Sequence, residues 1–320
     1  MNVLVTGASG FIGSKLLDRL DLSLVKVLGR DLPAGFPCSQ FYKHNIDGCT
    51  SYSEVLCNID TVVHLAARVH VMEDNATDPR EEYREVNTYG TVNLAKQAAK
   101  FGVKRFIFVS SIKVNGESSN HERPFTHKDV HSPQDYYGQS KSEAELELLK
   151  LSDETGLEIV VIRPTLVYGP GVKANFASLM NLVSKGIPLP FGCITNNKRS
   201  LVSVDNLVDL IITCIDHPKA ANQVFLVSDD HDVSTSEMVS EMTIALAKPT
   251  WQMPVPVWLY KLAGKLFNKS DVVDRLTGSL QVDITHTKET LGWNPPQTLQ
   301  DGFKQTAEAF LQSNKNSGES

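Results

Sequence analysis

The first twenty residues carry the pattern that most restricts the fold: an apolar strand, a turn of three glycines and an amphipathic helix. The strand-forming run Val3–Thr6 leads directly into Gly7, Gly10 and Gly13, and apolar residues then recur at helical spacing (Phe11, Ile12, Leu16, Leu17 and Leu20). Such glycines let the backbone approach a pyrophosphate, whose charge is stabilised by the unpaired N–H groups of a helix N-terminus. The spacing GxxGxxG matches the usual GxGxxG only loosely, so the turn alone is a weak indication of dinucleotide binding.

Strand-like and helix-like segments alternate along most of the chain. Short apolar runs predict strands, and the amphipathic stretches between them predict helices. The expected strands are Val3–Val5, Leu24–Leu28, Thr61–His64, Arg105–Val109, Glu158–Ile162 and Gln223–Val227, and the main expected helices are Phe11–Leu20, Ser51–Leu56, Arg80–Lys100 and Asp135–Lys150. This alternation predicts a parallel sheet that is covered by helices on both faces.

A second group of residues, in the middle of the chain, is suited to acid–base chemistry. Tyr137 and Lys141 are four residues apart in an expected helix, so both side chains project from one helical face. Because an ammonium group favours a nearby phenolate, we expect Lys141 to lower the pKa of Tyr137 from its usual value of about 10. Ser110 and Ser111 follow an expected strand, and open α/β sheets bind ligands at the carboxyl ends of their strands. Ser111, Tyr137 and Lys141 are therefore the predicted catalytic residues.

Together these motifs resemble those of the extended short-chain dehydrogenases/reductases that act on nucleotide sugars, the NAD-dependent epimerase/dehydratase family. The resemblance covers nearly the whole chain and rests on Thr6–Gly13, His64–Ala67, Asn87–Thr91, Ser110–Ser111, Tyr137–Lys141, Arg163–Gly171 and Arg199–Leu207. It implies an α/β fold, with a Rossmann-type doubly wound parallel sheet and a smaller, mostly helical C-terminal substrate lobe. We expect a dinucleotide-binding domain over 1–170, to which 199–228 returns, a substrate lobe over 171–198 and 229–312, and a disordered polar tail over 313–320.

The end of the second strand bears on the choice of cofactor. NAD sites usually place Asp or Glu there, whereas this chain has Gly29, followed by Arg30 and Asp31. A guanidinium beside a missing carboxylate suits a 2′-phosphate, so NADP(H) is slightly favoured, and NAD(H) stays open because Asp31 can occupy the acidic position. The resemblance further implies cofactor contacts from the glycine turn and from Asn45, Ile46, Leu65, Ala66, Ala67, Asn87, Tyr137, Lys141 and Pro164.

The residues after Ser111 narrow the reaction that the resemblance implies. Sugar 4,6-dehydratases carry an acidic pair there and enzymes like GDP-fucose synthase carry a cysteine, whereas this chain has Ile112 and Lys113. The first expectation is reduction of the C4 ketone of a UDP-4-keto-6-deoxy-N-acetylhexosamine, because Ser110–Glu117 and Gly171–Phe176 resemble bacterial reductases that form UDP-N-acetylquinovosamine for O-antigen. The alternative is UDP-sugar 4-epimerisation with a tightly bound NAD.

A nucleotide-sugar substrate requires cations for its diphosphate. Arg199 and Arg275 are the candidates, because a guanidinium can bind phosphate oxygens bidentately, although a surface ion pair explains Arg275 nearly as well. The resemblance implies that Asn175 and Phe176 meet the diphosphate and the nucleobase. Lys113 either reaches a phosphate or pairs with Glu117, two alternatives that the sequence leaves open.

Composition bears on the remaining classes of function. The net charge of −6 argues against nucleic-acid binding, which requires a basic surface. No apolar run is long enough to span a bilayer and no signal-like segment stands at the start, so we expect a cytoplasmic enzyme. The cysteines and histidines lack the spacing of metal ligands, so we expect no metal site. Arg80–Lys100 and Asp135–Lys150 resemble helices that pair in dimers of the family, so a homodimer is expected.

One apolar stretch near the C-terminus has two interpretations. Trp258, Leu259, Leu262, Leu266 and Phe267 recur at helical spacing after the segment Pro254–Pro256. Packing within the small lobe is the first expectation for such a helix, and contact with a membrane surface is the second.

Overall fold

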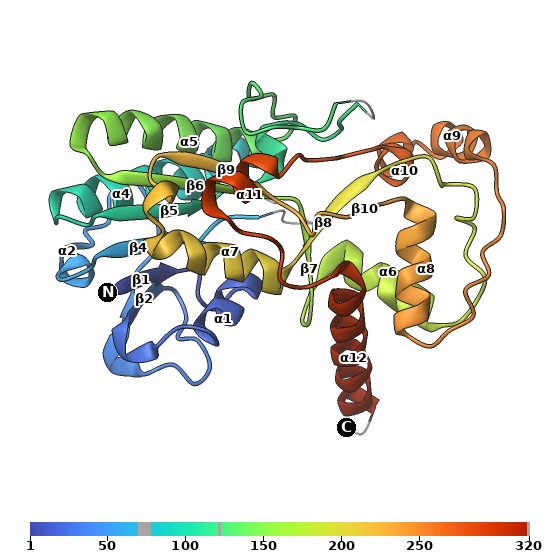
Figure 1. Cartoon of the computed structure of the whole chain (residues 1–320), viewed down its shortest axis with the longest axis horizontal. Coiled ribbons are helices and arrows are strands. Elements are labelled where there is room, and N and C mark those ends of the chain that lie inside the picture. The colour runs from blue at the N-terminus through green and yellow to red at the C-terminus, as the bar shows by residue number, and fades with distance from the viewer. Residues whose placement is uncertain (70–77, 121–122, 319–320) are drawn as a thin grey trace.

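Figure 1 shows the computed structural model of the chain, which describes residues 1–69, 78–120 and 123–318. Its main element is a seven-stranded sheet in the order β3-β2-β1-β4-β5-β6-β9, in which all neighbouring strands are parallel. The strands are β1 (Val3–Thr6), β2 (Val25–Gly29), β3 (Phe41–Lys43), β4 (Thr61–His64), β5 (Arg105–Val109), β6 (Glu158–Pro164) and β9 (Gln223–Val227). The predicted α/β fold with a doubly wound parallel sheet is confirmed.

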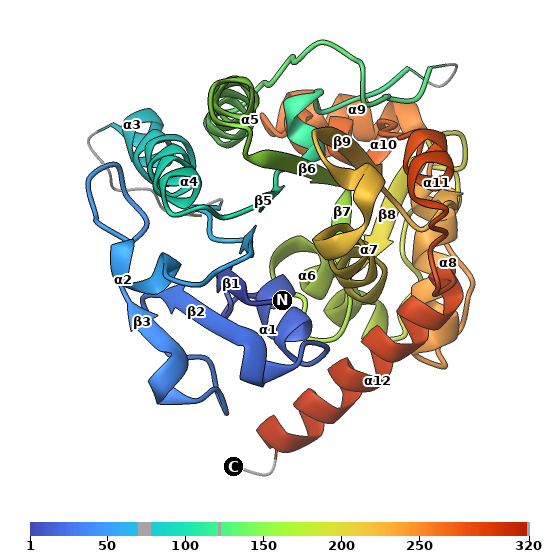
Figure 2. The same ribbon diagram turned by 60° about the vertical axis from the view of Figure 1, so that its left-hand side comes forward.

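Helices cover both faces of this sheet, as the alternation of elements predicts. Figure 2 shows α1 and α7 on one side of the strands and α3, α4 and α5 on the other. The helices are α1 (Phe11–Leu17), α2 (Ser53–Leu56), α3 (Pro79–Arg84), α4 (Thr91–Lys100), α5 (Tyr136–Thr155), α6 (Ala174–Ser184), α7 (Val204–Asp216), α8 (Thr235–Ala245), α9 (Val257–Leu266), α10 (Ser270–Thr277), α11 (Thr285–Leu291) and α12 (Leu299–Gly318).

The central strands β1, β4, β5 and β6 are mostly apolar because they are buried on both faces. Along β1, Val3 and Val5 belong to the hydrophobic cluster beneath α1 and α7, and Leu4 belongs to the cluster beneath α4 and α5. The strand order reverses between β1 and β4, since β2 and β3 extend the sheet on one side and β4 to β9 on the other. Ligands of such sheets bind at this switch point, beyond the carboxyl ends of the strands.

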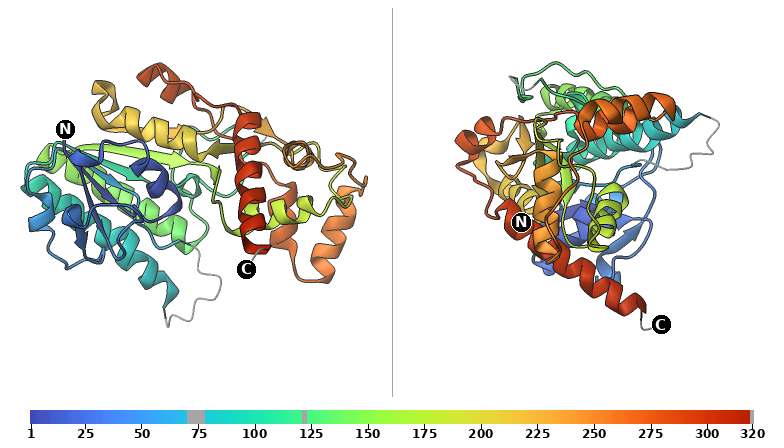
Figure 3. Two further views of the ribbon diagram at one scale, coloured as in Figure 1. Left: turned by 90° about the horizontal axis from the view of Figure 1, so that it is seen from below. Right: turned by 90° about the vertical axis from the view of Figure 1, so that its right-hand side faces the viewer.

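A second, three-stranded sheet begins the small lobe, in the order β10-β8-β7. It consists of β7 (Leu166–Tyr168), β8 (Arg199–Ser203) and β10 (Asp232–Val233), none of which is among the expected strands. The small lobe lies at one end of the main sheet (Figure 3). Its core includes a stack of three rings, formed by Tyr168, Phe176 and Phe303.

Two expected segments differ in detail from the structure. The helix expected over Arg80–Lys100 consists of α3, a π-helical turn over Glu85–Gly90 (η3) and α4. The helix α12 continues to Gly318, beyond residue 313, where a disordered tail is expected to begin. No helix among the described residues is long and apolar enough to cross a bilayer.

Candidate active site

The glycine turn lies at the switch point of the sheet and admits no side chain at two of its positions. Gly7 has a φ of +69°, and a Cβ there would lie 2.6 Å from the backbone nitrogen of Ala66. A Cβ at Gly13 would lie 2.2 Å from the carbonyl oxygen of Gly7. Gly10 precedes the first helical residue of α1 and has no side chain to cap the helix. The turn therefore keeps its backbone open in the way that a bound pyrophosphate requires.

A hydrogen-bonded chain holds the loop after β4 against this turn. The Oγ1 atom of Thr6 is 2.8 Å from Nδ1 of His64 and accepts a hydrogen bond of 3.2 Å from the backbone N–H of Ala66. The other ring nitrogen of His64 is 2.9 Å from Oγ1 of Thr91. Burial, and then the charge of Lys141, lowers the pKa of His64 to about 3, so its imidazole is neutral at physiological pH. His64 therefore has a structural role.

The three predicted catalytic side chains meet at the carboxyl end of β5. Ser111 follows the strand and caps the short 3-10 helix Ile112–Val114 by accepting a hydrogen bond from the backbone N–H of Lys113. The Ser111 side chain also hydrogen-bonds the phenol of Tyr137, in the first turn of α5. Lys141, one turn further along α5, donates a hydrogen bond of 3.0 Å to the carbonyl oxygen of Val109.

Lys141 is almost completely buried beneath this site. Its Nζ atom lies 4.4 Å from the ring centroid of Phe108, whose ring in turn stacks on His64. Burial lowers the pKa of Lys141 to about 7, because the interior disfavours the charged form. These contacts connect Lys141 through Phe108 on β5 and His64 on β4 to Thr6, which precedes the glycine turn.

The pKa of Tyr137 moves in the direction opposite to the one expected. Burial raises it to about 12, and the nearby carboxylate of Asp135 adds to the increase, whereas the Ser111 hydrogen bond acts against it. Asp135 caps α5 by accepting a hydrogen bond of 2.6 Å from the backbone N–H of Gly138. The expectation that Lys141 lowers this pKa is therefore wrong, because burial and the Asp135 carboxylate raise it and Lys141 is not among the groups that shift it.

Lys113 is held by carboxylates at the edge of the site. Its Nζ atom is 3.1 Å from Glu117 and 2.5 Å from Asp135. Of the two alternatives for Lys113, the structure has the pairing with Glu117, and it adds a partner that the sequence analysis missed. The hydrogen bonds and ion pairs to these acids raise the pKa of Lys113 although burial opposes the increase.

A buried ion pair that the sequence analysis missed lies directly behind the catalytic residues. The side chain of Glu145, four residues after Lys141 on α5, is fully buried and accepts hydrogen bonds from Ser110 at 2.5 Å and from Arg163 at 2.6 Å. Arg163 also donates to Asn115 at 2.9 Å. The spacing of four residues from Lys141 is the signal that places Glu145 on the same face of the helix.

The residues expected at the cofactor occupy the edge of the sheet on both sides of the switch point. Asn87 lies in the π-helical turn, is fully buried, and binds both the backbone of Arg68 and the hydroxyl of Ser140. Arg30 is exposed immediately after β2. The other predicted cofactor residues follow or end their strands: Asn45 and Ile46 after β3, Leu65, Ala66 and Ala67 after β4, and Pro164 at the end of β6.

Besides Lys113, four predicted substrate-binding residues lie outside the catalytic group, and two of them, Arg199 and Arg275, are in contact in the small lobe. Arg199, on β8, donates a hydrogen bond of 2.7 Å to the carbonyl oxygen of Arg275, at the end of α10. Burial, and then the charge of Arg275, lowers the pKa of Arg199. Phe176 is instead 5% exposed in the aromatic stack of the lobe, where it packs in the core. Asn175 is in the first turn of α6, and its side chain lies outside the described part of the structure.

Comparison with known proteins gives consistent matches. Residues 3–228 match the model of the NAD dependent epimerase/dehydratase family. The chain is 65% identical over 316 residues to the UDP-glucose 4-epimerase of Vibrio cholerae, covering 98% of this chain and 96% of that protein. It is 30% identical to the N-acetyl-alpha-D-glucosaminyl-diphospho-ditrans,octacis-undecaprenol 4-epimerase of Escherichia coli O157:H7, covering 95% and 94% of the two chains. The UDP-glucose 4-epimerase structure from Thermotoga maritima aligns with a TM-score of 0.74 at 24% identity, covering 98% and 99% of the two chains.

These matches correct the expected reaction. The 65% identity is to a protein named as a 4-epimerase and extends over nearly the whole of both chains. The expected reduction of a 4-keto sugar is therefore wrong, and the alternative, 4-epimerisation, is the reading that the comparisons favour. The reductase expectation rested mainly on the likeness of two short segments near Ser111 and Gly171. The catalytic Ser, Tyr and Lys could not correct it, because the two reactions are expected to use the same three residues.

Proposed function

The chain belongs to the NAD-dependent epimerase/dehydratase family, and we propose that it is a UDP-sugar 4-epimerase of the UDP-glucose type. The observation that carries this proposal is the 65% identity to the Vibrio cholerae UDP-glucose 4-epimerase over 98% of the chain. The proposed catalytic residues are Ser111, Tyr137 and Lys141, which meet at the carboxyl end of β5. Arg199 and Arg275 are proposed to bind the diphosphate of the substrate.

The residues at the switch point fit a dinucleotide. A Cβ at Gly13 would collide with the backbone of Gly7 and Ala8, so the glycine lets α1 pack closely on the turn, as dinucleotide sites of this fold require. When bound, a nicotinamide cofactor supplies a hydride acceptor and donor for C4 of the sugar. The backbone of the glycine turn is proposed to hold the pyrophosphate, and Lys141 and Asn87 are proposed to lie on the nicotinamide side.

Tyr137 is proposed to move the proton of the 4-hydroxyl group. Its raised pKa keeps the phenol protonated at neutral pH, so it can donate to a C4 ketone oxygen and must lose a proton before it accepts one. Ser111, which hydrogen-bonds the phenol, is placed to donate to the same oxygen and to stabilise the charge that develops on it. Lys141 is proposed to orient the cofactor.

The proposed reaction is tested by incubating the purified protein with UDP-glucose and with UDP-N-acetylglucosamine, without added cofactor. We expect conversion of UDP-glucose to UDP-galactose, followed by NMR of the sugar H1 signals, together with nicotinamide absorbance in the purified protein. Failure to convert either sugar, with or without added NAD, would contradict the proposal.

Asp135 provides a test of the acid–base role through the pH dependence of activity. Its carboxylate raises the pKa of Tyr137, so Asp135→Asn should lower that pKa and move the rise of kcat/KM with pH to lower pH. Asparagine remains a good N-cap, so α5 should keep its first turn. Glu117→Gln is the matched control, because Glu117, like Asp135, forms an ion pair with Lys113 but does not contribute to the raised pKa of Tyr137. An unchanged profile in Asp135→Asn would contradict this role.

Arg30 provides a test of cofactor preference. Within the described residues Arg30 forms no ion pair, and it is exposed beside the proposed adenosine site. Hydrogen bonds to charged groups contribute about 1.5–3 kcal/mol, so Arg30→Ala should weaken NADP⁺ binding by roughly ten-fold or more and NAD⁺ binding much less. Titration calorimetry with both cofactors measures the difference, and equal losses would show that Arg30 does not bind a 2′-phosphate.

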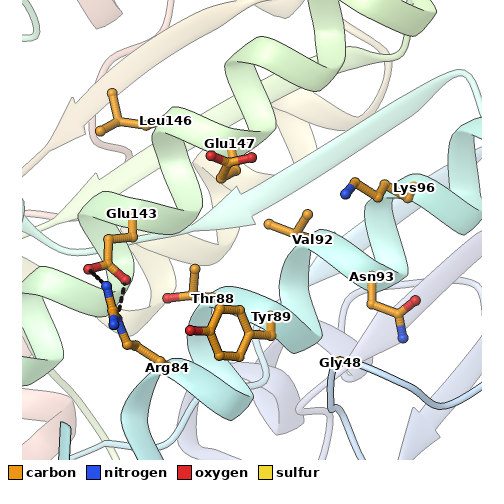
Figure 4. Close-up of a pocket in the computed structure, with 10 residues that line it drawn as sticks. All are labelled: Gly48, Arg84, Thr88, Tyr89, Val92, Asn93, Lys96, Glu143, Leu146 and Glu147. Atoms are coloured by element: carbon orange, nitrogen blue, oxygen red, sulfur yellow. Dashed lines mark hydrogen bonds and ion pairs between the residues drawn. The ribbon is translucent and has the colours of Figure 1, made fainter. Parts of the chain in front are cut away.

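The outer face of α4 and α5 is proposed to pair with a second copy of the chain. A groove of about 740 Å³ lies between η3, α4 and α5. Figure 4 shows Tyr89, Val92 and Leu146 among its lining residues, together with the ion pair between Arg84 and Glu143. Leu146 is 58% exposed on this face, so its side chain is available to a second copy of the chain. Leu146→Glu should convert a dimer to a monomer in analytical ultracentrifugation. A wild-type monomer, or a dimer that is unaffected by the substitution, would refute this arrangement.

A further inference from the structure

The helix α9 turns its apolar side outward. Trp258, Leu262 and Leu266 follow each other at intervals of four residues, so they share one face of the helix, and they are 62%, 58% and 77% exposed. The opposite side faces the protein, because Gly264 is buried against Val273 of α10. A helix on a globular protein normally has the reverse orientation, with its apolar stripe toward the core.

Other large apolar side chains in the same part of the sequence are exposed as well. Trp251 is 63% exposed, Phe267 is 70% exposed and Val272, on α10, is 44% exposed. Proteins rarely expose contiguous apolar patches of this kind unless the patch contacts a partner or a membrane. We define the α9 face as Trp258, Leu259, Leu262, Leu266 and Phe267. The packing within the small lobe that is first expected for these residues is not what the structure has.

The charge of this segment is opposite to that of the chain as a whole. Residues 242–270 contain four lysines and no acidic residue, in a chain whose net charge is −6. Lys261, Lys265 and Lys269 are exposed and form no ion pair within the described residues. Acidic side chains return only at Asp271 and Asp274, on α10. The α9 face is thus an apolar strip beside a local concentration of unpaired positive charge.

We propose that the α9 face docks on an anionic lipid bilayer, with the helix lying in the plane of the membrane surface. Leucine and phenylalanine side chains would enter the boundary of the acyl chains, Trp258 would lie at the level of the headgroups, and the lysines would contact lipid phosphates. The ten residues of α9 are too few to span a bilayer, which fits binding at the surface. A protein partner fits less well, because protein interfaces are depleted of lysine.

The test is co-sedimentation of the full chain with vesicles of phosphatidylcholine alone and of an equimolar mixture with phosphatidylglycerol. We expect binding to the mixed vesicles that weakens as salt is added, and much weaker binding to phosphatidylcholine. Leu262→Glu should reduce the partition constant by at least about ten-fold, since it removes a leucine that would enter the bilayer and adds a negative charge that anionic lipids repel. Lys265→Ala should reduce it by about five-fold, because each lysine near an anionic surface contributes on the order of 1 kcal/mol.

Val130→Glu is the matched control, since Val130 is 87% exposed in the other lobe and should be neutral. Circular dichroism and activity with a nucleotide-sugar substrate establish that each variant is folded. The proposal is overturned if the wild-type chain stays in the supernatant with both kinds of vesicle, or if Leu262→Glu and Val130→Glu bind alike. It is also overturned if the wild-type chain self-associates, Leu262→Glu abolishes that association, and vesicles are not bound, because a second copy then covers the α9 face.

Discussion

Tyr137→Phe should lower kcat by roughly 10²- to 10⁴-fold, the usual contribution of a positioned acid–base group. The phenol is the group that exchanges a proton with the 4-hydroxyl, and phenylalanine retains the ring that packs edge-on against Tyr83, with centroids 6.4 Å apart. Cofactor affinity should change little, because the glycine turn and Lys141 are intact. Steady-state kinetics with UDP-glucose and calorimetry with NAD⁺ measure the two effects separately.

The neighbouring residue offers a matched control for this substitution. Tyr136 is 49% exposed in the same turn of α5, so Tyr136→Phe removes a phenol of the same chemistry from outside the site. We expect this control to keep nearly all of its activity. Substantial turnover in Tyr137→Phe would show that Tyr137 is not the acid–base group.

Arg163→Leu should destabilise the protein by about 3–5 kcal/mol, because it leaves the buried carboxylate of Glu145 without its cation. The exposed fraction of the Arg163 side chain is 2% and that of Glu145 is 0%, so water cannot replace the lost partner. For a chain of this size the loss corresponds to a fall in Tm on the order of 10 °C. Thermal unfolding followed by circular dichroism measures it.

A second variant separates the unpaired charge from the loss of packing. Replacing both partners, Arg163→Leu together with Glu145→Leu, should recover much of the stability, because an apolar pair avoids the cost of the buried charge. Arg19→Leu is the control, since its ion pair with Asp209 is 2.8 Å long but 41% and 26% exposed, and such pairs contribute about 0–1 kcal/mol. If Arg163→Leu and Arg19→Leu have the same Tm, the buried ion pair between Arg163 and Glu145 contributes no more to stability than an exposed pair does.

The main sheet could be predicted from the sequence because its strands are buried on both faces and therefore read as continuous apolar runs. All six expected strands, from Val3–Val5 to Gln223–Val227, are present in the structure within one or two residues. The strands that were missed are short or lie outside this sheet. β3 has three residues at the sheet edge, and β10 has two.

The candidate catalytic residues could be identified from their spacing in the sequence, whereas the direction of the pKa shift of Tyr137 could not. The interval of four residues places Tyr137 and Lys141 on one helical face, and Ser111 follows a strand that is recognisable from its apolar residues. The pKa of Tyr137 depends instead on burial and on Asp135, which becomes a neighbour through the N-cap of α5. The ion-pair partner of Glu145, Arg163, is eighteen residues away on β6, and only the folded chain brings the two side chains together.

The reaction was the least predictable feature, for a chemical reason. Reduction and 4-epimerisation both need a proton donor at the C4 oxygen and a hydride at C4, so Ser111, Tyr137 and Lys141 serve either. In a reduction the ketone enters as the substrate and takes hydride from an exchangeable reduced cofactor. In an epimerisation the ketone is an intermediate that must turn within the site before the hydride removed from it returns. Phe176 illustrates the difficulty, since it was expected at the nucleobase and packs in the core of that lobe instead.

The proposed epimerisation requires that the hydride removed from C4 returns to C4 of the same sugar. The most direct measurement uses UDP-glucose labelled with deuterium at C4, in ordinary water and without added cofactor, with the product analysed by NMR and mass spectrometry. We predict UDP-galactose that retains the deuterium at C4. Product carrying ordinary hydrogen at C4, or no product, would contradict epimerisation at this site.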